Sequence, residues 1–155
     1  MTIKPLANHP EKIHALAQML HDEWKGFAPW TTRALIVDRL KSASTSQQFP
    51  YTFIALSADD QLLGSASIKI RELPEEADKI YWLGEVLIRK QSRGQGIGSA
   101  LIRACIDYTF NRVETSLYLY TPDQQELYKK FGWVSIDEKL INGEKVTIMQ
   151  LSKLI

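Results

Sequence analysis

The stretch "RGQGIGSALI", residues 93–102, places three glycines directly before an apolar, helix-forming run. The first N–H groups of a helix have no intrahelical partner, and the helix dipole adds partial positive charge there. Such a helix start accepts phosphate, and glycines let the backbone come close because they carry no Cβ. Arg93 could add a charge-assisted contact, and the Ser99 hydroxyl a further donor. The segment therefore predicts a phosphate-binding loop, with a tight turn that serves packing as the alternative.

The spacing of these glycines excludes two well-known phosphate motifs. The chain contains no G-x-x-x-x-G-K-[ST] sequence, so a P-loop is not predicted. Gly94, Gly96 and Gly98 follow a G-x-G-x-G pattern rather than the G-x-G-x-x-G of dinucleotide folds. A nucleotide-binding protein of unrelated fold remains an alternative function.

The histidines and the single cysteine do not form a metal-ligand pattern. His14 and His21 are seven positions apart, whereas zinc-binding pairs on a helix prefer four, and no cysteine joins them. We therefore expect solvated histidines and no metal. Cys105 falls among apolar residues of an expected helix and is interpreted as a buried thiol.

Composition narrows the class of protein further. The 155 residues fit one domain, spanning 1–155, with 45% hydrophobic and 24% charged residues. The formal net charge of +1 lacks the basic excess of nucleic-acid binders. The lone cysteine fits a reducing compartment, and neither a signal peptide nor a membrane span is expected. We expect a cytoplasmic protein with no nucleic-acid or membrane partner.

Hydrophobic periodicity predicts the elements that must position the glycine loop. Four strands are expected before the loop, and the last of them runs straight into it. The expected elements are a strand at 2–6, helices over 11–24 and after Thr31 or Thr32, strands at 51–56, 62–73 and 79–88, a helix at about 96–112 and a strand at 116–120.

The C-terminal third completes the predicted fold. A short helix is expected from Pro122, with the proline at the first helical position, and Asn142-Gly143 predicts a closing hairpin. The element order βααβββαβαββ predicts an α+β fold, with a mixed, largely antiparallel central sheet flanked by helices.

Two separate motifs resemble the GNAT superfamily of N-acetyltransferases. "RGQGIGSALI" is similar to that family's acyl-CoA pyrophosphate loop, through the R-x-x-G-x-G spacing of Arg93, Gly96 and Gly98. "LYLYTPDQQELYKKFGW" looks like its later strand and helix with a Y-x-x-x-G-F ending, where Trp133 replaces the usual phenylalanine. The expected element order matches as well. The resemblance implies an acetyl-CoA-dependent N-acetyltransferase, which joins cofactor and amine directly in one ternary complex.

The resemblance implies where acetyl-CoA would lie. In this family the strand before the loop splays from its neighbour, and its main chain pairs with the pantetheine arm. Thr121 stands where the family usually has asparagine, which weakens that contact. The implied cofactor-binding residues are Val86, Leu87, Ile88, Arg93, Gly94, Gln95, Gly96, Ile97, Gly98, Ser99 and Thr121.

Two side chains carry the chemistry that the resemblance implies. Tyr128 matches the family's tyrosine near the coenzyme A sulfur, where a phenol of ordinary pKa, about 10, can protonate the departing thiolate. Packing on one face of a short helix is the alternative. Glu85 is the candidate base, directly or through water, and the backbone N–H near Val86 or Leu87 would stabilise the oxyanion. Alternation places Glu85 among Leu83 and Leu87, which could raise its pKa; a structural salt bridge is the alternative.

Three aromatic residues mark the expected acceptor side. Trp24, Phe27 and Trp30 lie in the connector between the first two helices, where they would line an amine pocket or anchor the core. Asp22 or Glu23 could receive a cation. "MLHDEWKG", "QQFPYTFIALS" and "YTPDQQELYKKFGW" resemble the branch containing the actin N-terminal acetyltransferase, which raises a peptide N-terminus as acceptor beside small amines.

Two further expectations concern turnover and assembly. A GNAT-like module that binds acyl-CoA without turnover is the alternative to an enzyme, and the presence of both Tyr128 and Glu85 favours the enzyme. Many relatives in the superfamily dimerise through their last strands, so "KVTIMQLSKLI" is the candidate surface for a homodimer.

Overall fold

The computed structural model describes residues 1–27, 30–45 and 48–153. Their elements follow the predicted order, with three single-turn 3-10 helices added. These elements are β1 (Thr2–Pro5), η1 (Leu6–Asn8), η2 (Pro10–Lys12), α1 (Ile13–Trp24), α2 (Arg33–Thr45), β2 (Tyr51–Leu56), β3 (Leu62–Ile70), β4 (Tyr81–Ile88), η3 (Lys90–Ser92), α3 (Ile97–Phe110), β5 (Leu117–Thr121), α4 (Gln125–Lys129), β6 (Val134–Ile141) and β7 (Glu144–Leu151).

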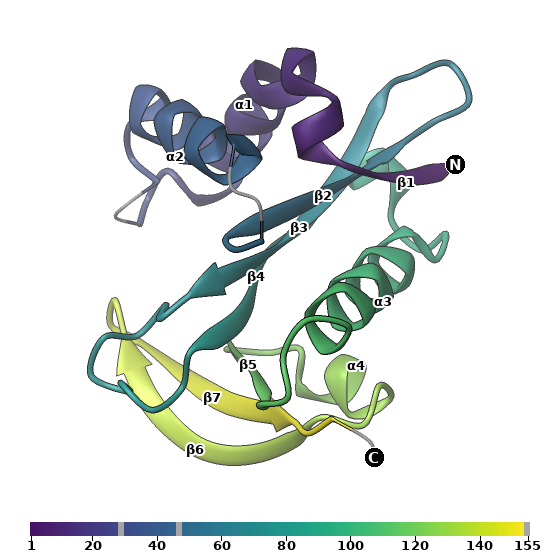
Figure 1. Cartoon of the computed structure of the whole chain (residues 1–155). Coiled ribbons are helices and arrows are strands. Elements are labelled where there is room, and N and C mark those ends of the chain that lie inside the picture. Colours follow the sequence, from purple (N-terminus) through teal and green to yellow (C-terminus); the bar gives the residue numbers. More distant parts are fainter. Residues whose placement is uncertain (28–29, 46–47, 154–155) are drawn as a thin grey trace.

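The strands form one seven-stranded sheet in the order β1-β2-β3-β4-β5-β7-β6 (Figure 1). Every pairing is antiparallel except that of β4 with β5. The predicted α+β class with a mixed, largely antiparallel sheet is therefore confirmed. The hairpin at Asn142-Gly143 is also present, with φ of 53° and 78° at the two turn residues.

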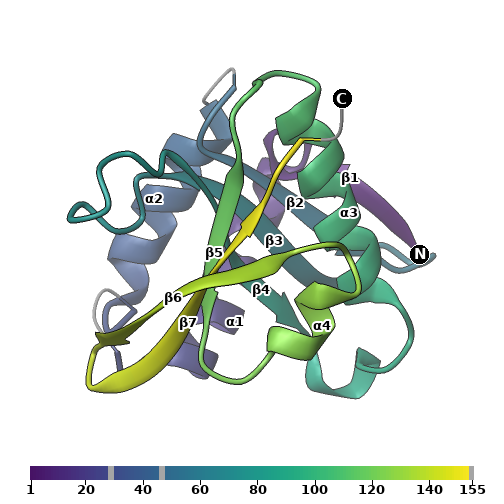
Figure 2. The same cartoon turned by 90° about the horizontal axis from the view of Figure 1, so that it is seen from below.

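Helices cover both faces of this sheet. Helices α1 and α2 pack on one face, and α3 and α4 lie on the other (Figures 1 and 2). The alternation of β2 shows why, because its successive side chains enter different cores: Ile54 and Leu56 meet α1 and α2, while Ala55 meets α3. Two buried layers thus fix the sheet between the helix pairs.

Because helices cover both faces of the sheet, polar side chains of β3 are buried as well. Ser65 and Ser67 alternate with apolar residues in β3, yet both are buried, at 1% and 3% exposure. The Ser67 hydroxyl pairs with that of Thr52 on β2 at 2.8 Å, so its burial is compensated. The helix expected from Pro122 also begins later, at Gln125, so the proline is not in its first turn.

Strand β4 contains a bulge that changes which way its side chains face. Ser65 pairs with Leu87 and Ser67 with Gly84, so two residues of β4 oppose one of β3. Glu85 at this bulge has φ of 55°, in the left-handed region. Because of the extra residue, Leu83 joins the core under α3 and Leu87 the core under α1 and α2. The expectation that Leu83 and Leu87 share one face is therefore wrong.

No helix within the described part of the chain is long and apolar enough to span a membrane.

Candidate active site

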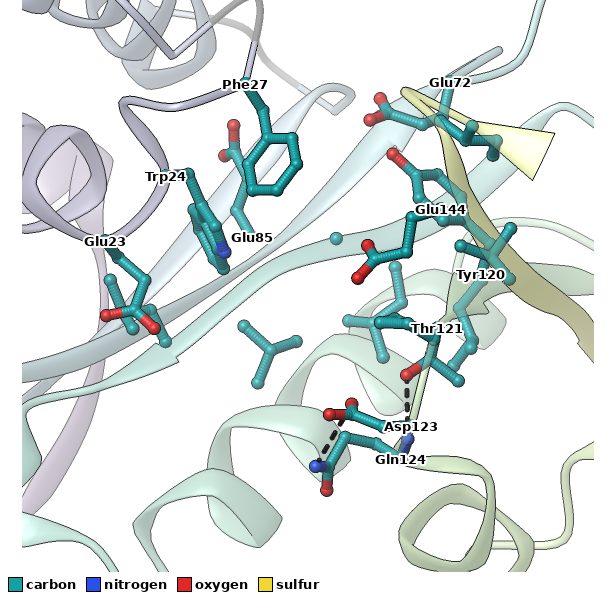
Figure 3. A pocket seen from close by; sticks show the side chains of 18 of the residues that line it. Glu23, Trp24, Phe27, Glu72, Glu85, Tyr120, Thr121, Asp123, Gln124 and Glu144 are labelled. Carbon is teal, nitrogen blue, oxygen red and sulfur yellow. Dashed lines mark hydrogen bonds between the residues drawn. The ribbon is translucent and has the colours of Figure 1, made fainter.

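A cavity opens where β4 and β5 separate. The two strands pair only at Tyr81 with Leu117 and at Trp82 with Tyr118. Beyond these pairs they diverge, as the family resemblance implied, and the gap is a cavity of about 680 Å³ (Figure 3). Its lining includes ten of the sequence-predicted site residues, Trp24, Phe27, Trp30, Glu85, Val86, Leu87, Ile88, Arg93, Thr121 and Tyr128.

The glycine loop lies beside this cavity, between η3 and α3. Gly94 and Gly96 have φ of 79° and 81°, which a residue with a Cβ adopts only at a cost. Helix α3 begins at Ile97, and Ala100 is the first residue whose N–H bonds back, to the Gly96 carbonyl. The amides of residues 97–99 therefore have no intrahelical acceptor. A Cβ on either of the two left-handed glycines would meet no atom within 4 Å, so the space beside the loop is open.

Arg93 links the loop to the open strand. Its Nε donates to the Ile88 carbonyl at 2.9 Å, and its Nη2 lies 3.9 Å from Glu23 Oε2. A second hollow of about 410 Å³ adjoins it, with Arg89 and Lys90 in its wall. Two acidic residues, Asp22 and Glu23, line the same hollow, so its charge is mixed. Arg93, next to the loop in sequence, is the basic side chain best placed to join the free amides of α3 in binding phosphate.

Tyr128 stands in the cavity wall on the α3 side. Its side chain is buried, and its ring meets Trp133 edge-on at a centroid distance of 6.0 Å. Burial, with a smaller contribution from Cys105, raises the pKa of Tyr128 to about 12. The hydroxyl is therefore protonated at neutral pH, but it releases its proton less readily than an ordinary phenol does. Burial also raises the pKa of the neighbouring Cys105 thiol. Any other thiol buried beside Tyr128 would have its pKa raised for the same reason.

Glu85 lies on the other side of the cavity, and its neighbours are charged rather than apolar. Its side chain is 5% exposed, and Oε1 lies 3.0 Å from Arg39 Nη2 and 3.6 Å from Lys69 Nζ. Lys69 also contacts Glu72 at 2.9 Å. The apolar surroundings expected for Glu85 are thus wrong, and the ion pairs named as the alternative are present.

Aromatic and acidic side chains lie around the rest of the cavity (Figure 3). Trp24 and Trp30 have ring centroids 5.2 Å apart, and Phe27 is 39% exposed. The acidic residues in the lining are Glu23, Glu72, Glu85, Asp123 and Glu144. Of these five carboxylates, Asp123 and Glu144 make no ion pair with a described residue.

Thr121 and Tyr120 end β5 at the floor of the cavity. The Thr121 hydroxyl accepts a hydrogen bond from the Gln124 amide at 3.0 Å, so it holds the turn into α4. Tyr120 interacts with Glu72, and burial raises its pKa to about 12, with Glu72 adding to the effect. Both hydroxyls therefore interact with neighbouring residues and help to hold the shape of the cavity.

Sequence reasoning did not single out several cavity and second-layer residues. These are Arg39, Lys69, Glu72, Tyr120, Asp123 and Glu144. They come from six elements or loops that meet only in the folded chain, so no local spacing could have identified them. One weak signal exists, since Lys69 and Glu72 are three residues apart at a strand end.

Known acetyltransferases are similar in sequence to most of the chain. The model of the acetyltransferase (GNAT) family matches residues 13–133. A protein named "Probable spermine N(1)-acetyltransferase" from Bacillus subtilis subsp. natto (strain BEST195) is 28% identical over 108 residues, which cover 65% of this chain and 71% of that protein.

Solved structures share the fold over nearly the whole chain. A ribosomal-protein-alanine N-acetyltransferase from Brucella melitensis superposes with a TM-score of 0.78, at 16% identity, covering 99% of this chain and 100% of that one. An aminoglycoside 6'-N-acetyltransferase complexed with coenzyme A gives 0.76 at 15% identity, covering 97% and 96%. At these identities the likeness concerns the fold.

Proposed function

The chain belongs to the GNAT family of acetyltransferases, and from this premise we propose that it acetylates a small amine that carries more than one positive charge. It is an acetyl-CoA-dependent N-acetyltransferase. The observation that carries the proposed acceptor class is the pair of lining carboxylates that make no ion pair with a described residue, Asp123 and Glu144. The other three lining carboxylates are already paired with arginine or lysine side chains. Aromatic rings in the same cavity lining add a second means of holding ammonium groups.

The cofactor fits the open edge of β4 and the glycine loop. The free amides of residues 97–99, with Arg93, would hold the pyrophosphate, because the loop leaves open space beside Gly94 and Gly96. Val86, Leu87 and Ile88 line the gap where β5 has diverged, so their main chain would pair with the pantetheine arm. Acetyl-CoA, when bound there, supplies the acetyl group and leaves as the free thiol.

Tyr128 and Glu85 would handle protons on opposite sides of the reacting carbon. Tyr128, protonated at neutral pH, would donate a hydrogen bond to the developing thiolate. Glu85 would take the proton of the amine, and since its side chain is only 5% exposed, we assign the transfer to a bridging water. The bulge beside Val86 would supply a backbone N–H to the carbonyl oxygen as it gains charge.

The acceptor would enter between the aromatic connector and β7. Asp123 and Glu144 are the lining carboxylates without an ion pair in the described chain, so each could receive an ammonium group (Figure 3). Asp123 Oδ1 accepts a hydrogen bond of 3.4 Å from Gln124 Nε2, which leaves its other oxygen for such a contact. An acceptor with its reacting nitrogen near Glu85 and a second charge near Glu144 would span the cavity. The curated relative named for spermine acetylation supports this class of acceptor.

Thermal shift followed by turnover tests the proposal. Acetyl-CoA at 100 times its dissociation constant should stabilise the fold by about 2.7 kcal/mol, while ATP and NAD should not. Thiol release should then be fastest with spermine or spermidine, slower with a monoamine, and slower still with a peptide that has an acidic N-terminus. Faster turnover of the peptide would contradict the proposed acceptor class, and stabilisation by ATP or NAD alone would contradict the cofactor.

A further inference from the structure

The bulge residue of β4 holds a conformation that its own chemistry does not favour. Glu85 has φ of 55°, and residues with a Cβ visit this left-handed region at a cost of about 1–2 kcal/mol. Such a conformation persists only where surrounding contacts fix it. The side chain of Glu85 can make those contacts, because it is nine-tenths buried or more.

Two cations from different elements meet on one oxygen of Glu85. Arg39 Nη2, from α2, lies 3.0 Å from Oε1, and Lys69 Nζ, from β3, lies 3.6 Å from the same atom. No described residue forms a hydrogen bond of good geometry with Oε1, so charge rather than a directed bond makes this contact. The bulge is therefore held from two sides by charge.

Trp30 fixes the two cations in turn. The Arg39 guanidinium lies 4.3 Å from the Trp30 ring centroid and Lys69 Nζ lies 5.4 Å from it. Lys69 is also held by Glu72, at 2.9 Å, and Glu72 interacts with Tyr120 on β5. We call Arg39, Lys69 and Trp30 the clamp. It joins the acceptor side of the cavity to the strand that would bind the cofactor.

Burial strengthens these ion pairs relative to ion pairs at the protein surface. The side chains of Glu85, Lys69 and Arg39 are 5%, 15% and 31% exposed. Charges that are largely removed from water interact more strongly than exposed pairs, and removing one partner leaves the other without compensation. Loss of either cation should therefore disturb the position of Glu85.

We propose that Arg39 and Lys69 are positioning residues for acetyl transfer, and that they act through Glu85 by fixing its carboxylate and the bulge of β4. The inference rests on the proposed role of Glu85 as base. It separates two functions on the acceptor side: the clamp holds the proton acceptor, while Asp123 and Glu144 would hold the substrate. The rival explanation is that Arg39 merely anchors α2 to the sheet.

A double-mutant cycle on turnover separates these explanations. Arg39→Met keeps an aliphatic chain against Trp30 and should lower kcat at least tenfold, with the Kd for acetyl-CoA changed less than twofold. Arg39→Lys keeps a cation and should recover most of kcat. In a Glu85→Gln background, Arg39→Met should cost less than threefold further, because its route of action is already gone. An equal loss in both backgrounds would overturn the proposal.

Matched variants make the result specific. Arg33→Met removes another arginine from α2, one whose contact is an exposed hydrogen bond of 3.4 Å to Gln18, and should leave kcat unchanged. Lys69→Met and Lys69→Arg repeat the loss and the rescue from β3. A fall in kcat with Arg33→Met as large as with Arg39→Met would assign the effect to α2 in general and overturn the proposal.

Urea unfolding tests the clamp independently of activity. The unfolding equilibrium constants of wild type, Arg39→Met, Glu85→Gln and the double variant should show a coupling of at least about fivefold. Strict additivity would remove the clamp whatever the enzyme acetylates. If the wild type transferred no acetyl group to any amine while the coupling was present, the proposed function would fail and the clamp would stand as a structural device only.

Discussion

Tyr128→Phe isolates a single hydroxyl in the proposed mechanism. The ring would keep its buried position and its edge-on contact with Trp133 at 6.0 Å. The hydroxyl makes no hydrogen bond to any described residue, so near neutral pH the free energy of unfolding should change by less than about 0.5 kcal/mol. If this hydroxyl assists the departing thiolate, kcat should fall about 10²-fold or more. That factor corresponds to about 2.7 kcal/mol of lost transition-state stabilisation.

The pKa of Tyr128 determines the pH range in which this residue changes the stability of the protein. Burial raises the pKa to about 12, against about 10 in the unfolded chain. Between these values the unfolded chain loses the proton while the folded chain keeps it, so stability is full below pH 10 and falls as pH rises toward 12. The difference between these two pKa values corresponds to about 2.7 kcal/mol, and the phenylalanine variant should lack this loss. An alkaline limb of activity below pH 10 cannot come from Tyr128.

The assay combines turnover, cofactor binding and unfolding. Thiol release at saturating acetyl-CoA gives kcat, titration gives the Kd for acetyl-CoA, and urea unfolding at pH 8 and near pH 11 gives the two stabilities. Tyr118→Phe, the same change on a tyrosine of β5 outside the cavity lining, is the control and should leave kcat within twofold. A Tyr128→Phe enzyme with wild-type kcat would refute the acid role, and a loss of cofactor affinity equal to the loss of kcat would assign the effect to binding.

Three further predictions follow from the cavity and its loop. Gly96→Ala should destabilise the fold by about 1–2 kcal/mol, because φ is 81° there, and should weaken acetyl-CoA binding in a titration. Gly98→Ala, with a Cβ 3.6 Å from Ile88 and no positive φ, should be neutral or stabilising in the same urea unfolding experiment. Glu144→Gln should raise the KM for spermidine about threefold to tenfold and leave that of a monoamine nearly unchanged, since one charged contact is worth about 1 kcal/mol.

The sequence was informative where function depends on a continuous segment. The glycine loop and α3 follow each other in the chain, so their residue types alone predict amides that point at a phosphate. The same holds for β2, whose predicted bounds match, and for the hairpin at Asn142-Gly143. In each case the backbone conformation is dictated by neighbours in sequence.

The neighbours of Glu85 and the bulge of β4 could not be predicted from the sequence in this way. A period of two along β4 predicts one face for Leu83, Glu85 and Leu87, but the bulge moves Leu83 to the other core. The extra residue is compensated by contacts with Arg39 and Lys69, which are distant in sequence. Charges that meet only through tertiary structure leave no periodic signal. Alternation therefore predicts apolar neighbours for Glu85, and the sequence names a salt bridge as the alternative without identifying its partners.

The narrow join between β4 and β5 has a consequence for the lifetime of the protein. Within the part of the chain that the structure describes, two residue pairs carry the strand pairing between the four N-terminal strands and β5, β7 and β6. A ligand that pairs with the free edge of β4 would act as the missing length of strand and tie the two parts together. We expect amide hydrogens of β5 and β7 to exchange faster, and proteases to cut there sooner, when acetyl-CoA is scarce. The abundance of such an enzyme would then follow the acetyl-CoA supply of its cell.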